Sequence, residues 1–215
     1  MRPLEPLSRD HEIISLITET ERSRVLLARR KSDNLEVVVK SLRSNINKPE
    51  DFLRIRREYG MLMELAIDGV VKIYDLMELD GSPALVLEYF KGITLQQFLE
   101  KYKDGLSLKT FFPIAMHIVS TLSEVHKRGI LHLDIKPSNI LIAKNRVCLT
   151  DFGISRQISG ENLFLLEGTL PYMAPEQTGK TSFPIDRRSD LYSLGVVFYE
   201  MISGTPVPRL SLTWL

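Results

Sequence analysis

The chain has 215 residues, of which 44% are hydrophobic and 26% are charged. This composition is typical of a globular protein and argues against a disordered, collagenous or coiled-coil chain. Lysine and arginine number 28 and aspartate and glutamate 27, which gives a formal net charge of +1. Because a nearly neutral chain has no overall field to attract polyanions, we expect neither nucleic acid nor an anionic membrane as a partner.

The sequence predicts a cytoplasmic protein without a membrane span. Its one cysteine, Cys148, cannot form an intramolecular disulfide, and the first 12 residues lack the apolar core of a secretory signal. The most membrane-like stretch without acidic or basic residues is 110–123, and these 14 residues include Pro113 and His117. A helix needs about 20 apolar residues to cross a bilayer.

Up to about residue 90, the pattern favours strands. Four apolar or β-branched runs occupy residues 25–28, 36–39, 70–76 and 83–89. Turn-forming residues separate the members of each pair, so we predict two hairpins. Between them, acidic residues follow Pro49, and the apolar side chains of Phe52, Ile55, Tyr59 and Leu62 have helical spacing. Glu58 falls along this predicted helix.

Beyond residue 92 the apolar period becomes helical. A long amphipathic helix that ends at Gly129 is predicted from the stripe Phe112, Ala115, Val119, Leu122 and His126. Two short strands follow, at residues 140–142 and 147–149. A last helix covers residues 189–202, and Gly204 is expected to end it.

Several motifs in this order resemble the protein kinase family. Residues 132–139 (HLDIKPSN) resemble the kinase catalytic loop, and 12 residues after Asn139 the sequence Asp151-Phe152-Gly153 resembles the metal-binding turn. Lys40, which closes an apolar strand, and Glu58 match upstream positions, while residues 168–169 and 172–176 resemble the end of an activation segment. The resemblance covers about residues 14–206. Each motif alone is weak, but together and in order they are highly specific.

The resemblance implies an α+β, two-lobed kinase fold. Residues 1–89 would form a small N-lobe with an antiparallel sheet, and residues 90–206 a mainly helical C-lobe that lacks its last helices. Residues 207–215 depart from the family and form a divergent tail. The sequence around residues 167–190 is also similar to the kinase heads of multidomain sensor histidine kinases, which implies contact with other modules of a larger signalling protein.

The resemblance assigns the charges that phosphoryl transfer requires. Because this reaction depends on positioning and charge stabilisation, cations are needed at the phosphates of ATP. Lys40, paired by Glu58, would hold the α and β phosphates. Lys136 would neutralise the transferred γ-phosphate, and together with Thr169 it implies serine or threonine as the acceptor in a protein substrate.

The acidic and amide side chains complete the implied machinery. Asp134 would accept the proton of the attacking hydroxyl group, as a general base. Asn139 and Asp151 would supply hard oxygen ligands to Mg²⁺. The remaining residues implied for ATP binding are Val25, Val38, Glu88, Phe90, Thr18, Thr20 and Ser23. Asp190 matches a helix residue that anchors the catalytic-loop backbone.

Three departures from the family pattern modify these expectations. Thr18, Thr20 and Ser23 stand where the phosphate-binding loop has glycines, so we expect weaker ATP binding. Leu133 replaces the arginine that binds a phosphorylated activation loop. We therefore hypothesise activity that does not depend on phosphorylation at Ser155, Ser159 or Thr169.

The third departure is the end of the kinase-like region. In the family, the residue that matches Glu176 pairs with an arginine from the missing helices, so the negative charge of Glu176 is expected to be poorly compensated.

Our main interpretation is an ATP- and Mg²⁺-dependent protein serine/threonine kinase in signal transduction. The alternatives are an inactive pseudokinase or scaffold, favoured by the missing glycines and helices, and a small-molecule phosphotransferase, which residues 168–176 argue against.

Overall fold

The computed structural model describes residues 10–20, 23–43, 48–144, 146–157, 170–179 and 181–206. The chain divides into two compact units, the first within residues 1–66 and 71–90 and the second within residues 67–70 and 91–215. Among the described residues no helix is long and apolar enough to cross a membrane. The domain boundaries 1–89, 90–206 and 207–215 stay predictions, and the tail lies outside the described residues.

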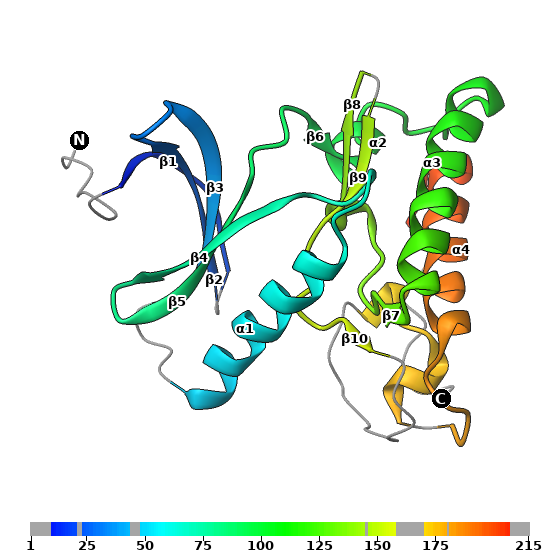
Figure 1. Ribbon diagram of the computed structural model, residues 1–215. Coiled ribbons are helices and arrows are strands. Elements are labelled where there is room, and N and C mark those ends of the chain that lie inside the picture. The colour runs from blue at the N-terminus through cyan, green and yellow to red at the C-terminus, as the bar shows by residue number, and fades with distance from the viewer. Residues whose placement is uncertain are drawn as a thin grey trace. The chain divides into compact units, whose positions relative to one another are not determined.

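The first unit is built on a five-stranded antiparallel sheet in the order β1-β2-β3-β5-β4 (Figure 1). Its strands are β1 (His11–Glu19), β2 (Ser23–Arg30), β3 (Leu35–Leu42), β4 (Ile73–Leu79) and β5 (Ser82–Glu88). Both predicted hairpins are confirmed. Their turns use residues with positive φ, Asn34 at 63° in one and Asp80 at 53° with Gly81 at 76° in the other, because such tight turns require left-handed backbone.

The two faces of this sheet have different roles. Side chains alternate along a strand, and one face forms a core of Leu26, Ala28, Val37, Val39, Leu79, Ala84 and Val86. The intervening residues of β3, Val38 and Lys40, therefore point to the opposite face. There Lys40 is in register with Val25 of β2 and Leu85 of β5. The alternation of β3 thus places Lys40 on the face away from this core.

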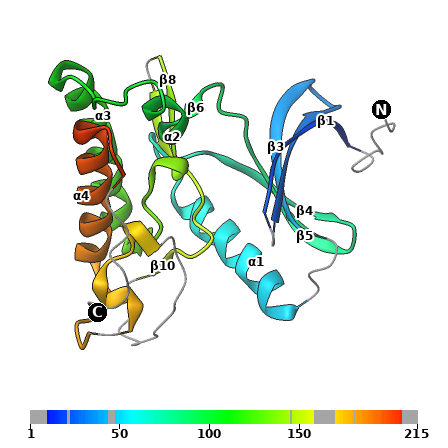
Figure 2. The ribbon, with the colours of Figure 1, turned by 180° about the vertical axis from the view of Figure 1, so that it is seen from behind.

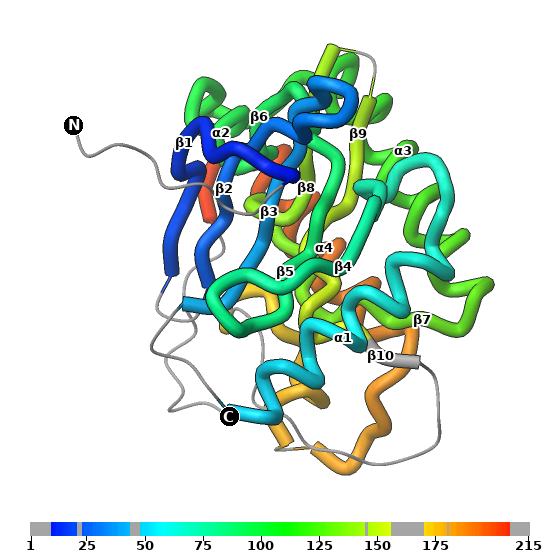
Figure 3. The backbone as a smooth tube through the Cα atoms, turned by 60° about the vertical axis from the view of Figure 1, so that its left-hand side comes forward, coloured from blue at the N-terminus to red at the C-terminus, as the bar shows by residue number. Residues whose placement is uncertain are grey.

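Helix α1 (Pro49–Glu64) lies against β4 and β5 (Figure 3). It begins with a proline in its first turn, followed by Glu50 and Asp51, whose charges suit a helix N-terminus. Ile55 and Leu62 of the predicted stripe are buried together with Glu58, whereas Phe52 and Tyr59 are half-buried. A buried glutamate within an apolar stripe needs a partner.

Helices α3 (Leu108–Lys127) and α4 (Arg187–Ser203) dominate the second unit and lie side by side (Figures 1 and 2). They run antiparallel, because the residues that precede α3 contact the C-terminal end of α4, with Leu106 N–H donating to the Met201 carbonyl at 2.7 Å. Gly204 has a φ of 70° and caps α4, which confirms it as the predicted stop.

The buried face of α3 is displaced from the predicted stripe. Ala115, Leu122 and His126 are buried as expected, but Phe112 and Val119 are exposed. The buried side chains are Phe111, Ile114, Ala115, Ile118, Thr121, Leu122, Val125 and His126. Because apolar residues occur on both sides of this helix, their spacing gives more than one acceptable stripe, and packing on α4 decides between them.

Shorter elements surround these two helices. They are β6 (Ile93–Thr94), α2 (Leu95–Leu99), β7 (Ile130–Leu131), η1 (Pro137–Asn139), β8 (Ile140–Ala143), β9 (Arg146–Leu149), β10 (Arg156–Gln157), η2 (Leu170–Tyr172) and η3 (Pro175–Thr178). Strands β6, β8 and β9 form one small sheet, and β7 pairs with β10. The predicted strands at 140–142 and 147–149 are confirmed as β8 and β9.

A Gly105→Ala substitution is expected to lower the free energy of unfolding by about 2–4 kcal/mol. Gly105 has a φ of +83°, and a Cβ there would lie 1.8 Å from the Ile202 carbonyl oxygen, so the substitution combines left-handed strain with overpacking. Chemical denaturation measures the loss. The control is Gly129→Ala, with a φ of +72° and no atom within 4 Å of the new Cβ. Equal losses in both variants would show that the close approach to α4 contributes nothing.

Candidate active site

The first unit contains the predicted lysine–glutamate pair. Lys40 Nζ donates to Glu58 Oε1 at 2.7 Å and to Oε2 at 3.0 Å. The Glu58 side chain is only 3% exposed and that of Lys40 17%, so the carboxylate is screened from water and held by a bidentate contact. This pair joins β3 to α1 and fixes the direction of the ammonium group.

Four other residues implied for nucleotide binding lie on strands β2, β3 and β5 or just after β5. Val25 is directly opposite Lys40, and Val38 lies two residues before it on the same face. Glu88 ends β5, where its backbone is paired with Val37, and the buried Phe90 follows it. Val25 thus lies on β2, Val38 and Lys40 on β3, and Glu88 at the end of β5, with Phe90 in the segment that follows β5.

Hydroxyl groups close the turn in which the family has glycines. Thr20 N–H donates to the Ser23 carbonyl at 2.8 Å, and Ser23 N–H donates to Thr20 Oγ1 at 3.0 Å. Thr18 lies at a register shift between β1 and β2. None of the three residues has a positive φ, so at these positions the backbone does not use the conformations that glycine permits.

In the second unit, the catalytic loop brings three of the predicted residues together. Asp134 Oδ2 accepts hydrogen bonds from Lys136 Nζ at 2.7 Å and from Asn139 Nδ2 at 2.8 Å. Asn139 Nδ2 also lies 2.9 Å from the Asp134 carbonyl. A carboxylate oxygen held by an ammonium group and an amide N–H keeps a fixed orientation, as a general base requires.

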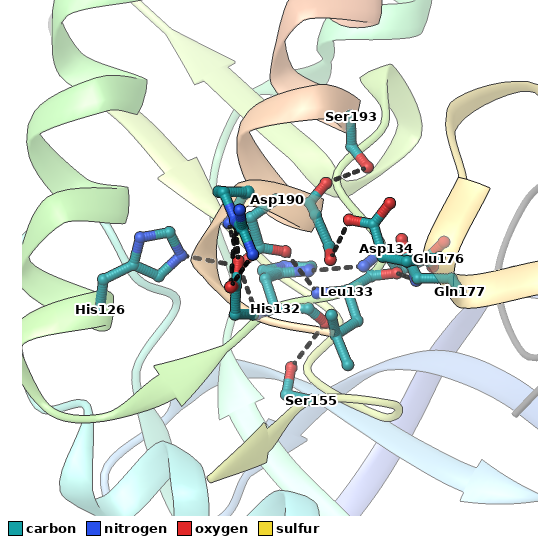
Figure 4. A network of polar contacts seen from close by, with 12 residues as sticks. His126, His132, Leu133, Asp134, Ser155, Glu176, Gln177, Asp190 and Ser193 are labelled. Carbon is teal, nitrogen blue, oxygen red and sulfur yellow. Dashed lines mark hydrogen bonds and ion pairs between the residues drawn. The ribbon is translucent and has the colours of Figure 1, made fainter. Parts of the chain in front are cut away.

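Asp190 anchors the backbone of this loop, as predicted (Figure 4). Its Oδ1 accepts from Leu133 N–H at 2.7 Å, and its Oδ2 accepts from His132 N–H at 2.9 Å. His126 of α3 contributes a third contact, with Nε2 at 2.7 Å from Asp190 Oδ2. The aspartate is fully buried, so these three donors take the place of water.

The anchored backbone is strained at Leu133. This residue has a φ of 64°, and for a residue with a Cβ the left-handed conformation costs about 1–2 kcal/mol. Two further side chains hold the adjacent carbonyls: Ser155 Oγ donates to the His132 oxygen at 3.0 Å, and Gln177 Nε2 to the Leu133 oxygen at 3.0 Å. Sequence reasoning missed both contacts, and the only signal was a polar residue at each position.

His132 is a packing residue rather than a ligand. Its ring is fully buried and lies 4.5 Å from the Phe152 ring, centroid to centroid. Nε2 is 3.2 Å from the Thr150 carbonyl, and Nδ1 is 3.3 Å from Asp134 N–H. A carbonyl only accepts and an amide N–H only donates, so the proton is on Nε2.

The two predicted Mg²⁺ ligands lie on neighbouring segments. Thr150 N–H donates to the Asn139 carbonyl at 3.0 Å, which brings the chain just before Asp151 against Asn139. Asp151 has a φ of 65°. One carboxylate and one amide oxygen suit Mg²⁺ when phosphates complete its shell. No group of three or more histidine, cysteine, aspartate or glutamate side chains suited to a metal occurs in the described part of the chain.

The end of the activation segment packs on α4. Tyr172 O–H donates to Glu200 Oε2 at 2.6 Å, and burial together with this carboxylate raises the pKa of Tyr172 well above its ordinary value. Ser189 Oγ donates to Glu176 Oε1 at 2.6 Å. A serine of α4 therefore gives Glu176 a neutral hydrogen-bond partner, and the expectation that its charge is poorly compensated stays a prediction.

The hypothesis about activation-loop phosphorylation is only partly covered by the structure. Ser155 is 5% exposed and its hydroxyl is engaged, so in this conformation a kinase could not reach it. Ser159 and Thr169 lie outside the described residues. The predicted residues thus form two groups, Lys40 with Glu58 in the first unit and Asp134 with Lys136 and Asn139 in the second.

A lysine–glutamate pair on a five-stranded sheet, and an aspartate–lysine–asparagine loop anchored by a helix aspartate, define a phosphotransferase of the kinase type. The protein kinase domain family matches residues 12–211. This match covers most of the chain, which therefore belongs to the protein kinase domain family.

Curated relatives agree with this assignment. Serine/threonine-protein kinase PknB of Mycolicibacterium smegmatis is 35% identical over 213 residues, which cover 93% of this chain and 33% of that protein. PknB of Mycobacterium leprae is 36% identical over 211 residues, with the same two shares, 93% and 33%. A probable serine/threonine-protein kinase PknB of Bifidobacterium longum is 35% identical over 187 residues, covering 79% of this chain and 26% of that protein. The chain thus spans about a third or less of the length of these relatives. The finer similarity to the heads of sensor histidine kinases stays a prediction.

Proposed function

We propose that this chain catalyses the transfer of the γ-phosphate of ATP to serine or threonine side chains of a protein substrate, with Mg²⁺ as cofactor. The observation that carries the proposal is the geometry of Asp134, which is held by Lys136 and Asn139 at 2.7 and 2.8 Å. The names of the relatives, serine/threonine-protein kinases, support the choice of acceptor. A substrate protein and contacts with other modules of a signalling protein belong to the same proposal.

Each residue contributes one part of this chemistry. Lys40, oriented by Glu58, would bind the α and β phosphates of ATP. Asn139 and Asp151 would hold Mg²⁺, which offsets the negative charge of the phosphates. Asp134 would accept the proton of the substrate hydroxyl group. Lys136, whose ammonium group pairs with the Asp134 carboxylate, would neutralise charge on the transferred phosphoryl group.

One observation favours the alternative of an inactive pseudokinase. Thr20 and Ser23 are joined by hydrogen bonds that use the Thr20 hydroxyl group, and neither of them nor Thr18 has a positive φ. Backbone N–H groups there approach phosphates less readily than those of a glycine-rich loop. This favours weak ATP binding, whereas the engaged Lys40–Glu58 pair favours retained binding.

A thermal melt with and without MgATP is the test, with Lys40→Met as the variant. At about 100 times its dissociation constant, a ligand that binds only the folded state stabilises it by roughly 2.7 kcal/mol. We expect the melting temperature of the wild type to rise and that of Lys40→Met to stay unchanged. The control is Lys31→Met, an exposed lysine of the β2–β3 turn, which should keep the full shift.

Transfer itself is then measured with labelled ATP on serine- and threonine-containing peptides, free serine and sugars in parallel. Label in the peptides alone supports the proposal. Label in free serine or sugars favours a small-molecule phosphotransferase. A wild type that melts cooperatively without any shift favours the pseudokinase, and an equal shift in Lys40→Met contradicts the role of that lysine.

A further inference from the structure

The peptide that precedes Asp134 is held by side chains from three separate segments (Figure 4). Asp190 of α4 binds the N–H groups of His132 and Leu133. The two carbonyls of the same residues are bound by other side chains, that of His132 by Ser155 and that of Leu133 by Gln177. All four polar groups of the His132–Leu133 backbone therefore have a side-chain partner.

Ser155 and Gln177 lie at the two ends of the activation segment. Ser155 follows Asp151 by four residues, and Gln177 lies in η3 at the far end, next to Glu176. Their contacts with the loop span 23 and 44 residues of sequence. In kinases with an arginine at the position of Leu133, that arginine ties the loop to the activation segment through a phosphate. Here the tie uses a hydroxyl group and an amide.

Gln177 is well suited to such a tie. Its side chain is 2% exposed, its Oε1 accepts from Ala174 N–H at 3.1 Å, and its Nε2 donates to the Leu133 carbonyl at 3.0 Å. The amide thus bridges the end of the activation segment and the catalytic loop. Ser155 is 5% exposed and donates to His132. Both contacts are buried, where water does not compete for the donors.

We propose that Ser155 and Gln177 are positioning residues that hold the left-handed Leu133 peptide, and through it the carboxylate of Asp134, without a phosphate on the activation segment. The inference rests on the proposed kinase function. Leu133 precedes Asp134 directly, so a rotation of its peptide turns the carboxylate away from an attacking hydroxyl. A small misplacement of a reacting group costs up to about 100-fold in rate.

The test compares Ser155→Ala and Gln177→Met with Ser107→Ala in the phosphatase-treated chain. Ser107→Ala removes the hydroxyl that caps α3, where Ser107 Oγ accepts from Thr110 N–H, so it lowers stability away from the catalytic loop. We expect kcat to fall about tenfold in each loop variant, which is roughly 1.4 kcal/mol of barrier, with the KM for ATP within about twofold of the wild type. Ser107→Ala should keep the wild-type kcat, and Ser155→Thr, which retains the hydroxyl donor, should recover most of it.

Hydrogen exchange gives a readout that does not depend on activity. Amide protection in a fragment covering residues 131–135 should fall in Ser155→Ala and Gln177→Met and stay unchanged in Ser107→Ala. If the wild type transfers phosphate and all three variants show the same kcat, the inference is wrong while the proposed function stands. Unchanged protection in both loop variants also overturns it. A wild type without transfer but with the expected loss of protection contradicts the proposed function and leaves the fixing of the loop supported.

Discussion

An Asp134→Asn variant will lose phosphate transfer by a factor of about 10²–10⁴ and keep nearly all of its MgATP binding. This factor is the rate enhancement that a general acid or base typically contributes in enzymes. Asparagine has the shape of aspartate but accepts no proton from a substrate hydroxyl. Its amide oxygen still accepts from Lys136 or Asn139, so the loop geometry, set by 2.7 and 2.8 Å contacts, is largely retained.

Steady-state kinetics on a peptide, together with the MgATP melt, separates the two effects. We expect kcat to fall and the ATP-induced shift in melting temperature to stay as in the wild type. Asp80→Asn is the control, because Asp80 lies in the β4–β5 turn of the first unit and pairs with Arg24 on its surface. Wild-type kcat in Asp134→Asn would rule out this residue as the general base.

An Asp190→Ala variant will lose about 3–5 kcal/mol of folding stability. The substitution leaves the N–H groups of His132 and Leu133 and the ring of His126 without their buried acceptor. Breaking a buried charged contact by removal of one partner costs about this much, because the remaining polar groups stay out of water unpaired. So large a loss is a substantial fraction of the free energy of unfolding of a domain, which is about 5–15 kcal/mol.

Chemical denaturation of the second unit measures this loss. The matched control is Asp186→Ala in the same helix, because Asp186 caps α4 by accepting from Arg188 N–H at 2.8 Å. Arg188 also lowers the pKa of Asp186, so the capping carboxylate stays ionised. Loss of a cap costs about 0.5–2 kcal/mol. Equal losses in both variants would mean that Asp190 contributes no more than a helix cap does.

Local chemistry made much of the fold predictable. The hairpins and the end of α4 at Gly204 follow from turn residues and from a glycine that adopts a φ of 70°, which are properties of a few adjacent residues. The prediction of which face of α3 is buried was partly wrong, because Phe112 and Val119 are exposed. Their burial depends on how α3 packs against α4, which the spacing of apolar residues along one helix does not specify.

In the candidate site, too, some residues could be predicted from the sequence and some contacts could not. Motif spacing picked out Lys40, Asp134 and Asn139, since the chemistry of phosphoryl transfer restricts which residue types can serve. The contact of Gln177 with Leu133 spans 44 residues and involves a backbone carbonyl, so no side-chain pattern reveals it. Nor did the sequence indicate that Ser189 is the partner of Glu176, because serine is common at the start of helices.

The anchor at Asp190 has a consequence for the order in which the chain is made. Leu133 and its acceptor are 57 residues apart, so a ribosome has completed the catalytic loop well before it adds the residue that holds it. The hairpins of the first unit pair strands that are adjacent in sequence, so they can form as soon as both strands have been synthesised. During synthesis the loop therefore stays without its anchor until α4 has emerged, and only then can its backbone take the conformation that Asp190 holds.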